Sequence, residues 1–437
     1  MDSPIRDNDT ALGTLHWYAA AVCLVWYIIM MSLGLFGVWV VKTTYGRTYH
    51  SRSASSPDSP GVSILRPLKG LDVEMDACLE SAFLQDYPRD KFEVILSVAD
   101  ARDPAVTVAK DVIERHPEVN ARLIIGGEDV GPNPKINNLI RSYESAKFDI
   151  LWVLDSNVWV SPGTLGRSVD AFASSPRIQL VHHLPVCVSS DAPEDSTWGA
   201  RLEENYMSCA HAKMYSAINK VAIAPCVMGK SNLFRRSDLN RVAPGGLTDF
   251  AQFIAEDHLI ADALWTKGGG RTVLTEDCAR QPVRGTSATT YFLRRVRWIR
   301  VRKFMVTAAT LVEPITESLL CAAIGAFALR TFYGISFLFT YVATLAVWCA
   351  SDYVQFRALH SCANVEYSPY TPAFARGNLN MGPGWFVTWI VRELTAVPVW
   401  ITAMAGQGVT WRDRLFRIKV DMTVEEIRPL DAREWRA

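Results

Sequence analysis

ILWVLDSN, at residues 150–157, is an apolar run that ends abruptly in acidic and polar side chains. A short run of this kind, rich in β-branched and aromatic residues, predicts a strand. The stretch EVILSVAD at 93–100 has the same form, so that Asp100 follows one strand and Asp155 the other. In open α/β sheets, ligands bind outside the carboxyl ends of the strands, which is where both carboxylates are expected.

The surrounding sequence alternates such runs with helix-like stretches. Other β-rich runs are VSIL at 62–65, RLII at 122–125 and QLVHHL at 179–184. Asn133 followed by Pro134 is an N-cap and first-turn pair, which predicts a helix through about Ala146. The alternation predicts an α/β domain with a largely parallel sheet at residues 61–288.

A long apolar tract precedes this domain. Residues 17–41 contain no charged side chain over 25 positions, and roughly 20 apolar residues span a bilayer. We therefore expect a transmembrane anchor there, with residues 1–16 as a lumenal tail. Basic residues follow in a Ser/Pro/Arg-rich linker at 42–60, so the positive-inside rule places the α/β domain in the cytosol.

Residues 304–405 are expected to form further membrane helices. The apolar tracts lie at 304–328, 332–350 and 385–405. If all three crossed the bilayer, the basic tail at 406–437 would be lumenal, against the positive-inside rule. The first tract carries Glu313 and Glu317, and carboxylates in a membrane are costly unless they face protein or water. We expect this tract to be interfacial or re-entrant and the tail to be cytosolic.

Overall composition limits the classes of partner and compartment. Lys plus Arg and Asp plus Glu are each 45, and the isoelectric point is about 7.1, so no global charge favours nucleic acid. The nine cysteines are scattered and form no C-x-x-C pair. This pattern argues against a disulfide framework or a zinc site and suits a reducing compartment.

The basic residues concentrate in TYFLRRVRWIRVRK at 290–303, directly before the apolar tracts. On a helix, Arg294 and Arg297 share a face and Trp298 lies one turn beyond Arg294. We expect an interfacial helix at 289–303. Because the run abuts a membrane tract, a nucleic-acid partner is disfavoured.

Asp100, Asp155 and Asp257, followed by R-x-x-R-W at 294–298, resemble the D, D, D, (Q/R)-x-x-R-W signature of inverting membrane glycosyltransferases with the GT-A fold. That group includes the cellulose, chitin and hyaluronan synthases. Longer stretches are similar to the ceramide glucosyltransferases, glycosyltransferase family 21. These are SILRPLKGLD at 63–72, VGPNPKINNL at 130–139, WVLDSN at 152–157 and FAQFIAEDHLIADAL at 250–264. The resemblance implies a Rossmann-like GT-A domain with transmembrane helices.

The resemblance also implies a reaction and a place. The reaction is transfer of glucose from UDP-glucose to the primary hydroxyl of ceramide with inversion, on the cytosolic face of a Golgi membrane. A processive polysaccharide synthase shares the motifs but normally has more spanning helices. A non-enzymatic membrane adaptor that uses only the basic stretch is the third reading, and it predicts that Arg297→Lys and Asp257→Asn have no effect.

Roles for individual residues follow from the same resemblance. Asp100 is expected at the uridine and Asp155 at the diphosphate, through Mg²⁺ or Mn²⁺ if a cation is used. The usual D-x-D motif reads Asp155-Ser156-Asn157 here, which weakens the case for a metal. Lys135, Asn137 and Asn138, in the first turns of the predicted helix, are expected to contact the nucleotide.

The acceptor side of the site is assigned in the same way. Asp257 is the expected general base, although the residues alone do not distinguish it from Glu256. Arg297, assisted by Arg294, is expected to stabilise charge on the departing diphosphate, because guanidinium groups fork onto phosphate oxygens. Trp298 is expected to form the floor of the acceptor site, and the resemblance adds His211 as an acceptor-site residue.

Overall fold

The computed structural model describes residues 4–191, 196–377, 383–411 and 414–427. A seven-stranded sheet forms its centre, in the order β3-β2-β1-β4-β6-β5-β7. The strands are β1 (Val62–Leu68), β2 (Phe92–Val98), β3 (Ala121–Ile125), β4 (Ile150–Leu154), β5 (Ile178–Ser189), β6 (Ser231–Arg235) and β7 (Arg271–Val283). All neighbours are parallel except β6, which is antiparallel to β4 and β5. The largely parallel α/β sheet expected from the sequence is confirmed.

Helices cover both faces of the sheet, because the side chains of each buried strand alternate between two cores. Ile64 of β1 packs into one core with α2, α3 and α5, and the adjacent Leu65 packs into the other with α4, α8 and α9. The helices are α2 (Met75–Phe83), α3 (Ala105–Arg115), α4 (Pro134–Ser145), α5 (Thr164–Ala173), α8 (Arg236–Val242) and α9 (Glu256–Thr266). The helix predicted to begin after Asn133 is α4.

A third group of helices lies between the sheet and the membrane tracts. It consists of α6 (Trp198–Tyr206), a π-helical turn (Met207–His211), α7 (Ala212–Val221) and α10 (Ala288–Arg302). The first three elements follow one another without a break, and the π-helical turn offsets α6 from α7. Such turns frequently mark functional sites.

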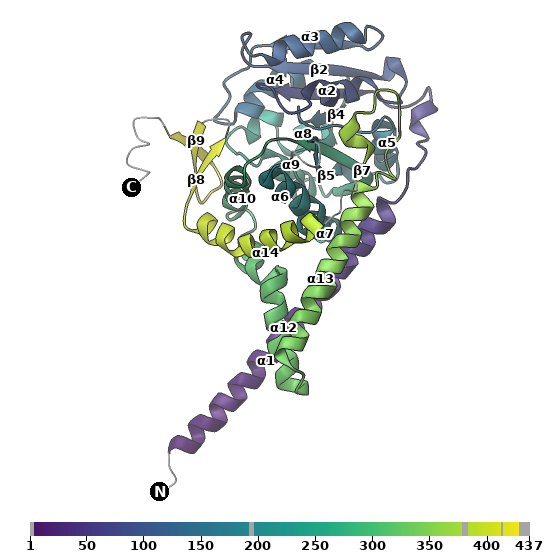
Figure 1. Cartoon of the computed structure of the whole chain (residues 1–437). Coiled ribbons are helices and arrows are strands. Elements are labelled where there is room, and N and C mark those ends of the chain that lie inside the picture. Colours follow the sequence, from purple (N-terminus) through teal and green to yellow (C-terminus); the bar gives the residue numbers. More distant parts are fainter. Residues whose placement is uncertain (1–3, 192–195, 378–382, 412–413, 428–437) are drawn as a thin grey trace.

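Three helices extend together away from the sheet domain (Figure 1). They are α1 (Pro4–Thr44), α12 (Ser318–Tyr333) and α13 (Phe337–His360), and they contact one another. The chain between α10 and α12 forms α11 (Thr307–Val312) and a 3₁₀ turn (Glu313–Thr316), bent by 71° from α12. By length and composition, three helices are able to cross a membrane, namely the ones at 13–44, 337–360 and 383–404, or up to four if the bent pair is one span.

The last apolar helix, α14 (Pro383–Met404), is placed differently. It runs along the edge of the sheet domain, crosswise to α13 (Figure 1), and packs against α6 and α10. The sequence predicts that the tract containing Glu313 and Glu317 is interfacial or re-entrant. That tract is bent by 71° between its two helical parts, whereas α14 lies crosswise to α13, and the assignment of the interfacial tract stays a prediction.

The chain after α14 folds into a small antiparallel sheet that the sequence analysis treated only as a tail. Its strands are β8 (Gly408–Trp411), β9 (Arg414–Ile418) and β10 (Val424–Ile427). Arg300 of α10 and Lys303, the C-cap of that helix, hold it. Arg300 donates to the Gly408 carbonyl at 2.6 Å, and Lys303 donates to the Gly406 carbonyl at 2.6 Å. Arg300 and Lys303 therefore fix the C-terminal sheet to the end of α10.

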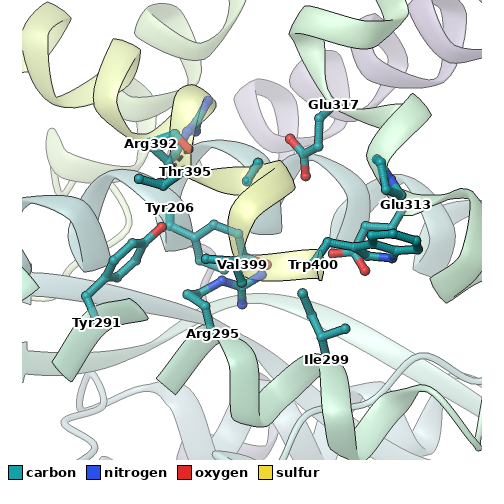
Figure 2. Close-up of a pocket in the computed structure, with 13 residues that line it drawn as sticks. Tyr206, Tyr291, Arg295, Ile299, Glu313, Glu317, Arg392, Thr395, Val399 and Trp400 are labelled. Atoms are coloured by element: carbon teal, nitrogen blue, oxygen red, sulfur yellow. Dashed lines mark hydrogen bonds between the residues drawn. The ribbon is translucent and has the colours of Figure 1, made fainter. Parts of the chain in front are cut away.

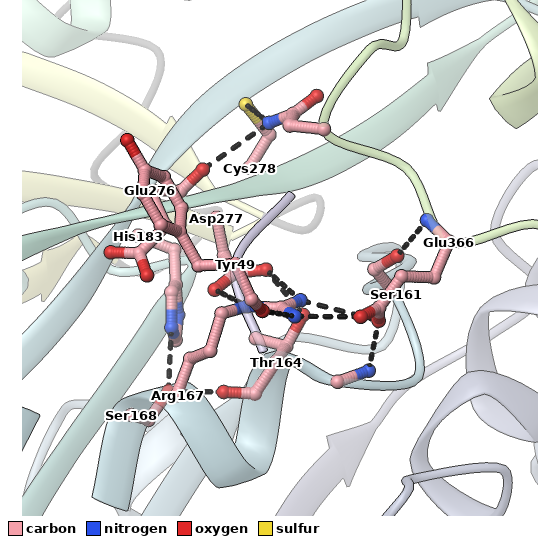
Figure 3. Close-up of polar contacts among 12 residues, drawn as sticks. Tyr49, Ser161, Thr164, Arg167, Ser168, His183, Glu276, Asp277, Cys278 and Glu366 are labelled. Carbon is pink, nitrogen blue, oxygen red and sulfur yellow. Dashed lines mark hydrogen bonds and ion pairs between the residues drawn. The ribbon is translucent and has the colours of Figure 1, made fainter. Parts of the chain in front are cut away.

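A buried ion pair holds the linker and the segment after α13 against the sheet (Figure 3). Arg167 of α5 bonds both carboxylate oxygens of Asp277 on β7, at 2.7 and 2.9 Å. The same guanidinium donates to the Tyr49 carbonyl at 3.0 Å and to Glu366 at 2.7 Å. One side chain thus joins a helix, a strand and two segments next to the membrane.

Replacing Arg167 with methionine is expected to lower the free energy of unfolding by about 3–5 kcal/mol, because Asp277 is left buried without its partner. The measurement is thermal or denaturant unfolding of the purified protein in detergent. Arg115→Met is the matched control: its pair with Asp76 has side chains that are 45% and 55% exposed, and exposed pairs contribute about 0–1 kcal/mol. Equal losses in both variants would contradict the prediction.

Candidate active site

The register of β4 and β6 brings Asp155 opposite Lys230. The antiparallel pairing matches Leu154 with Ser231, and the next pair continues it, with the Asp155 amide donating to the Lys230 carbonyl at 3.0 Å. The Lys230 ammonium donates to Asp155 Oδ2 at 3.1 Å and to Asn157 Oδ1 at 3.3 Å. A lysine is thereby held between the two ends of the DSN segment, at the carboxyl end of β4.

Lys135 reaches the same place from the first turn of α4. Asn133 caps this helix by accepting from the amides of Lys135 and Ile136 at 2.8 and 3.2 Å. Lys135 Nζ lies 3.2 Å from Asp155, 3.0 Å from Glu256 and 3.2 Å from Asp257. We call Lys135, Asp155, Lys230, Glu256 and Asp257 the Lys135 cluster. It borders a pocket lined by Lys135, Glu256, Asp257, Asn232 and apolar side chains of the sheet and of the helices α4 and α9.

Burial and mutual charge set the protonation of this cluster. Burial acts against the ammonium of Lys135, but the three carboxylates outweigh it and hold its pKa well above the usual value. Burial similarly opposes ionisation of Asp155, yet Lys135 and Lys230 prevail and lower its pKa. Burial, with the adjacent Asp257, raises the pKa of Glu256 to about 7. At neutral pH a charged Lys135 therefore faces an ionised Asp155.

Asp257 and Glu256 are neighbours in sequence but differ in environment. The Glu256 side chain is 4% exposed and that of Asp257 is 19% exposed. Glu256 is also fixed by Asn133, whose Nδ2 donates to it at 3.0 Å. Glu256 thus anchors the start of α9 to α4, whereas Asp257 is the carboxylate of the two that a substrate can reach.

Gly229 packs directly on the Asp257 carboxylate. A Cβ at this glycine would lie 1.7 Å from Asp257 Oδ2, so Gly229→Ala must displace that side chain. Displacement by about 1 Å costs on the order of 10²-fold in rate when geometry is critical. We expect Gly229→Ala to lower kcat by about that factor, measured with purified protein in an assay of the glucosyl transfer expected from the sequence. Gly13→Ala is the control, because a Cβ there meets nothing within 4 Å; unchanged kcat in Gly229→Ala would contradict the placement of Asp257.

The R-x-x-R-W segment lies on α10, next to the cluster. Arg294 pairs with the buried Glu203 of α6 at 3.3 Å and donates to Gln281 Oε1 at 3.3 Å. Burial acts to lower the pKa of Arg294, but Glu203 and, more weakly, Asp155 raise it on balance. Trp298 stands edge-on to Tyr206, with ring centroids 6.4 Å apart. It also packs in one apolar cluster with Met228, which precedes Gly229.

Comparison with known proteins identifies the family. The model of glycosyl transferase family 21 matches residues 22–424. A ceramide glucosyltransferase of Komagataella phaffii is 40% identical over 98% of this chain and 95% of its own length. One of Pyricularia oryzae is 38% identical over 94% of each chain. The chain belongs to glycosyltransferase family 21.

Family 21 membership makes the protein a glycosyltransferase, the enzyme class predicted from the motifs, and agrees with the GT-A class expected for its sheet. A solved mannosyltransferase of Pyrobaculum calidifontis, in complex with GDP-Man and Mn²⁺, is 20% identical, with a TM-score of 0.47 over 89% of this chain and 98% of that chain. Within the part of this family 21 enzyme that the structure describes, no group of three His, Cys, Asp or Glu residues is arranged to hold a metal.

Asp100 lies apart from the Lys135 cluster in the family 21 enzyme. It follows β2, on the far side of β1 from β4, and its exposed carboxylate accepts from Arg102, with an Oδ2–Nη2 distance of 2.9 Å. Hydrogen bonds from Arg102 lower its pKa. Its contact with the uridine stays a prediction.

Asn137 and Asn138, in the first turns of α4, hold the scaffold. Asn137 donates to the Gly131 carbonyl at 2.8 Å and so closes the loop before α4. Asn138 donates to the carbonyls of Leu68 and Ser97, at 3.0 Å each, and joins the carboxyl ends of β1 and β2. Both amides shape the site from behind, and their direct contact with a nucleotide stays a prediction.

Arg297 and His211 complete the set of predicted residues. Arg297 Nη1 donates to the Thr410 carbonyl of β8 at 3.4 Å. His211 ends the π-helical turn and stacks on Tyr215, at 5.0 Å between ring centroids. Burial, with nearby Arg295 and Arg302, lowers the pKa of His211 to about 3, so it is neutral. The roles assigned to both residues stay predictions.

Lys230, Gly229 and Glu203 are members of the site that sequence reasoning missed. Lys230 follows a loop and precedes a strand, and only the antiparallel register of β6 brings it to Asp155. The dipeptide Gly229-Lys230 before a β-rich run was the available signal. No sequence signal marked Glu203, because a glutamate within a helix is ordinarily a solvent-facing residue.

Proposed function

We propose that this enzyme is a ceramide glucosyltransferase that transfers glucose from UDP-glucose to the primary hydroxyl of ceramide, with inversion at the anomeric carbon. The observation that carries the proposal is the meeting of Lys135 with Asp155 and Asp257 at the carboxyl end of β4, beside the R-x-x-R-W helix. Two lysines supply the positive charge that a diphosphate needs, and an accessible carboxylate supplies a base. Curated relatives that match nearly the whole chain have the same activity.

Asp257 is the general base in this proposal. It takes the proton of the ceramide hydroxyl while the hydroxyl oxygen forms its bond to the anomeric carbon. The bond from that carbon to the diphosphate breaks on the opposite face, and UDP leaves with the electron pair. Lys135 orients the Asp257 carboxylate through its 3.2 Å contact. A single displacement of this kind inverts the configuration, to give the β-glucoside.

The positive side chains receive the departing diphosphate. Lys135 and Lys230 contact Asp155 and lie at the strand end where phosphates are expected. Arg297 adds a forked guanidinium, which matches paired phosphate oxygens, after exchanging its contact with Thr410. Fixed positive groups aimed at developing charge are among the largest contributions to catalysis.

The proposal includes a divalent cation, Mg²⁺ or Mn²⁺, with Asp155 as its one protein ligand. Mg²⁺ is held by one or two carboxylates together with substrate phosphates, so Asp155 is sufficient as the protein ligand once the diphosphate is bound. The cation would neutralise charge on the diphosphate. Asn157 stands where the D-x-D motif has its second aspartate, and it contacts Lys230. Lys230 therefore competes with a cation for the place beside Asp155 and Asn157. Stripping divalent cations with EDTA and restoring them one at a time tests this point.

The proposal includes a membrane arrangement. The protein is a membrane protein with about three candidate spans. We place the sheet domain in the cytosol at a Golgi membrane, with α1, α12 and α13 crossing and α14 at the interface. Three crossings bring the C-terminal sheet to the cytosolic side, in agreement with its contacts to α10 and with its basic residues.

The testing experiment offers purified protein UDP-glucose and UDP-galactose separately, each with short-chain ceramide. We expect one β-linked glucose per lipid from UDP-glucose and a much slower reaction from UDP-galactose. A long glycan as the product would instead indicate a processive synthase. Absence of glucosylceramide with Mg²⁺, with Mn²⁺ and without a cation would refute the proposal.

A further inference from the structure

The segment from Met228 to Lys230 carries two contacts of the site. Gly229 packs on the Asp257 carboxylate, and Lys230 Nζ lies 3.1 Å from Asp155. The pairing of β6 with β4 fixes the Lys230 end, where the carbonyl of Lys230 accepts from the Asp155 amide. Met228, at the other end, belongs to no helix or strand, so its position depends on side-chain contacts.

Tyr215 of α7 holds the Met228 end. The Met228 amide donates to the Tyr215 hydroxyl at 3.1 Å, and the same hydroxyl lies 2.7 Å from His182 Nδ1 of β5. Burial, with the adjacent His183, lowers the pKa of His182 to about 3, so the ring is neutral at pH 7. Burial also raises the pKa of Tyr215 well above its usual value, so the hydroxyl keeps its proton. It can therefore accept from Met228 while donating to His182.

The helix that carries Tyr215 is fixed to the membrane helices. Lys213, two residues earlier on α7, pairs with Asp352 of α13 at 2.7 Å, and both side chains are buried. Gly37 of α1 packs on the same turn of α7, because a Cβ there would overlap the carbonyl oxygen of Lys213. The Tyr215 hydroxyl is thus held relative to two candidate membrane spans.

The chain returns from the end of α7 to Met228 along the face that Tyr215 occupies. Ala222 ends the helix in a left-handed conformation, with φ 54°. Tyr215 and Asn219 are four residues apart and so share one face of α7. Asn219 donates to the Cys226 carbonyl at 2.9 Å, while Tyr215 accepts from Met228. Two side chains of one helix therefore hold the returning chain.

Aromatic rings pack beside Tyr215 and do not depend on its hydroxyl. His211 stacks on Tyr215, with ring centroids 5.0 Å apart, and Tyr206 lies 6.2 Å from His211. Tyr206 lines a pocket between α10 and α14, where the Arg295 guanidinium lies over its ring (Figure 2). Tyr215→Phe keeps this stack of rings. The substitution therefore removes one hydrogen-bonding group and leaves the packing in place.

We infer that the Tyr215 hydroxyl is a positioning group for the reaction: by fixing the Met228 amide, it sets where Gly229 holds the Asp257 carboxylate. Tyr215 touches no reacting atom. The inference rests on the proposed function and deepens it by naming what determines the position of the base. Misplacement by about 1 Å costs on the order of 10²-fold in rate, so freedom at the residue next to Gly229 is expected to lower kcat.

The kinetic test uses full-length protein in nanodiscs. Tyr215→Phe is expected to lower kcat about tenfold, because the segment from Met228 to Lys230 is no longer fixed at one end. KM for UDP-glucose should stay within about twofold, since β6 still holds Lys230. Tyr45→Phe is the matched control: Tyr45 is buried in the same apolar cluster as Tyr215, and its hydroxyl donates to the Thr275 carbonyl at 3.1 Å. It should lose comparable thermal stability and keep kcat.

The double variant Tyr215→Phe/Gly229→Ala distinguishes positioning from a general loss of stability. Gly229→Ala already displaces the Asp257 carboxylate, so adding Tyr215→Phe should lower kcat by less than about threefold more. An effect of Tyr215 that does not pass through Gly229 would repeat the full tenfold loss. Multiplicative losses, or an unchanged kcat in Tyr215→Phe, would overturn the inference.

Hydrogen–deuterium exchange tests the hold on the segment without any substrate. Peptides that contain Met228 are expected to exchange faster in Tyr215→Phe than in the unmodified protein, and Tyr45→Phe should leave them unchanged. Equal exchange of these peptides in Tyr215→Phe and the unmodified protein would overturn the inference. Faster exchange in a protein that transfers no glucose to ceramide would refute the proposed function and keep the hydroxyl as the group that fixes Met228.

Discussion

Asp257→Asn is expected to lower kcat by about 10²–10⁴-fold, the usual contribution of a positioned general base. KM for UDP-glucose should change little, because the lysines that meet the diphosphate remain. The reason is geometric: Asp257 is the more exposed of the two adjacent carboxylates, is held by Lys135 at 3.2 Å and rests on Gly229. Steady-state kinetics with UDP-glucose and short-chain ceramide measure both constants.

Glu256→Gln is the matched control for this experiment. Glu256 is buried between Asn133 and Lys135, so neutralising it should lower stability more than it lowers kcat. We expect a reduced melting temperature and a decrease in kcat of less than about tenfold, well below the range for a lost general base. The reverse order of effects, with Glu256→Gln inactive and Asp257→Asn active, would assign the base to Glu256.

Arg297→Lys is expected to lower kcat by about 10²–10³-fold, comparable to the loss of one donor to a developing anion. A lysine keeps the charge but cannot fork onto two phosphate oxygens. The assay is the same, with single-turnover measurements to isolate the chemical step.

Arg300→Lys provides the control for Arg297→Lys, because Arg300 lies on the same helix and donates to the carbonyls of Thr402 and Gly408. It should affect stability and leave kcat within about threefold. Full activity in Arg297→Lys would mean that this residue serves only as a membrane flank, as in a charge-only adaptor.

The strands and the acidic strand ends were predictable from the sequence because they depend on local patterns. ILWVL at 150–154 is β4 residue for residue, and Asn133-Pro134 begins α4. Family motifs added Lys135 and Asp257. No local pattern predicts that Lys135 and Asp257 lie in contact. They are 122 positions apart in the sequence, and the contact depends on how α9 packs beside α4.

The remaining parts of the site depend on tertiary register. Lys230 reaches Asp155 only because β6 runs antiparallel to β4. Arg294 and Arg297 have the spacing of a shared helix face, but Arg294 finds the buried Glu203 while Arg297 finds the C-terminal sheet. That sheet is built from short, polar strands without a strong periodic signal, so its docking on α10 was not foreseen.

The orientation of α14 is another feature that the sequence alone did not predict. Its composition is that of a membrane span, and composition alone does not distinguish a helix that crosses a bilayer from one that lies along it. Packing against α6 and α10 decides its direction.

A structure with UDP bound tests the central claim most directly. We predict that the diphosphate lies at the carboxyl end of β4, within hydrogen-bond distance of Lys135 or Lys230, with Asp257 left free on the side that faces Trp298. A diphosphate bound elsewhere, with Lys135 still enclosed by its three carboxylates, would contradict the account.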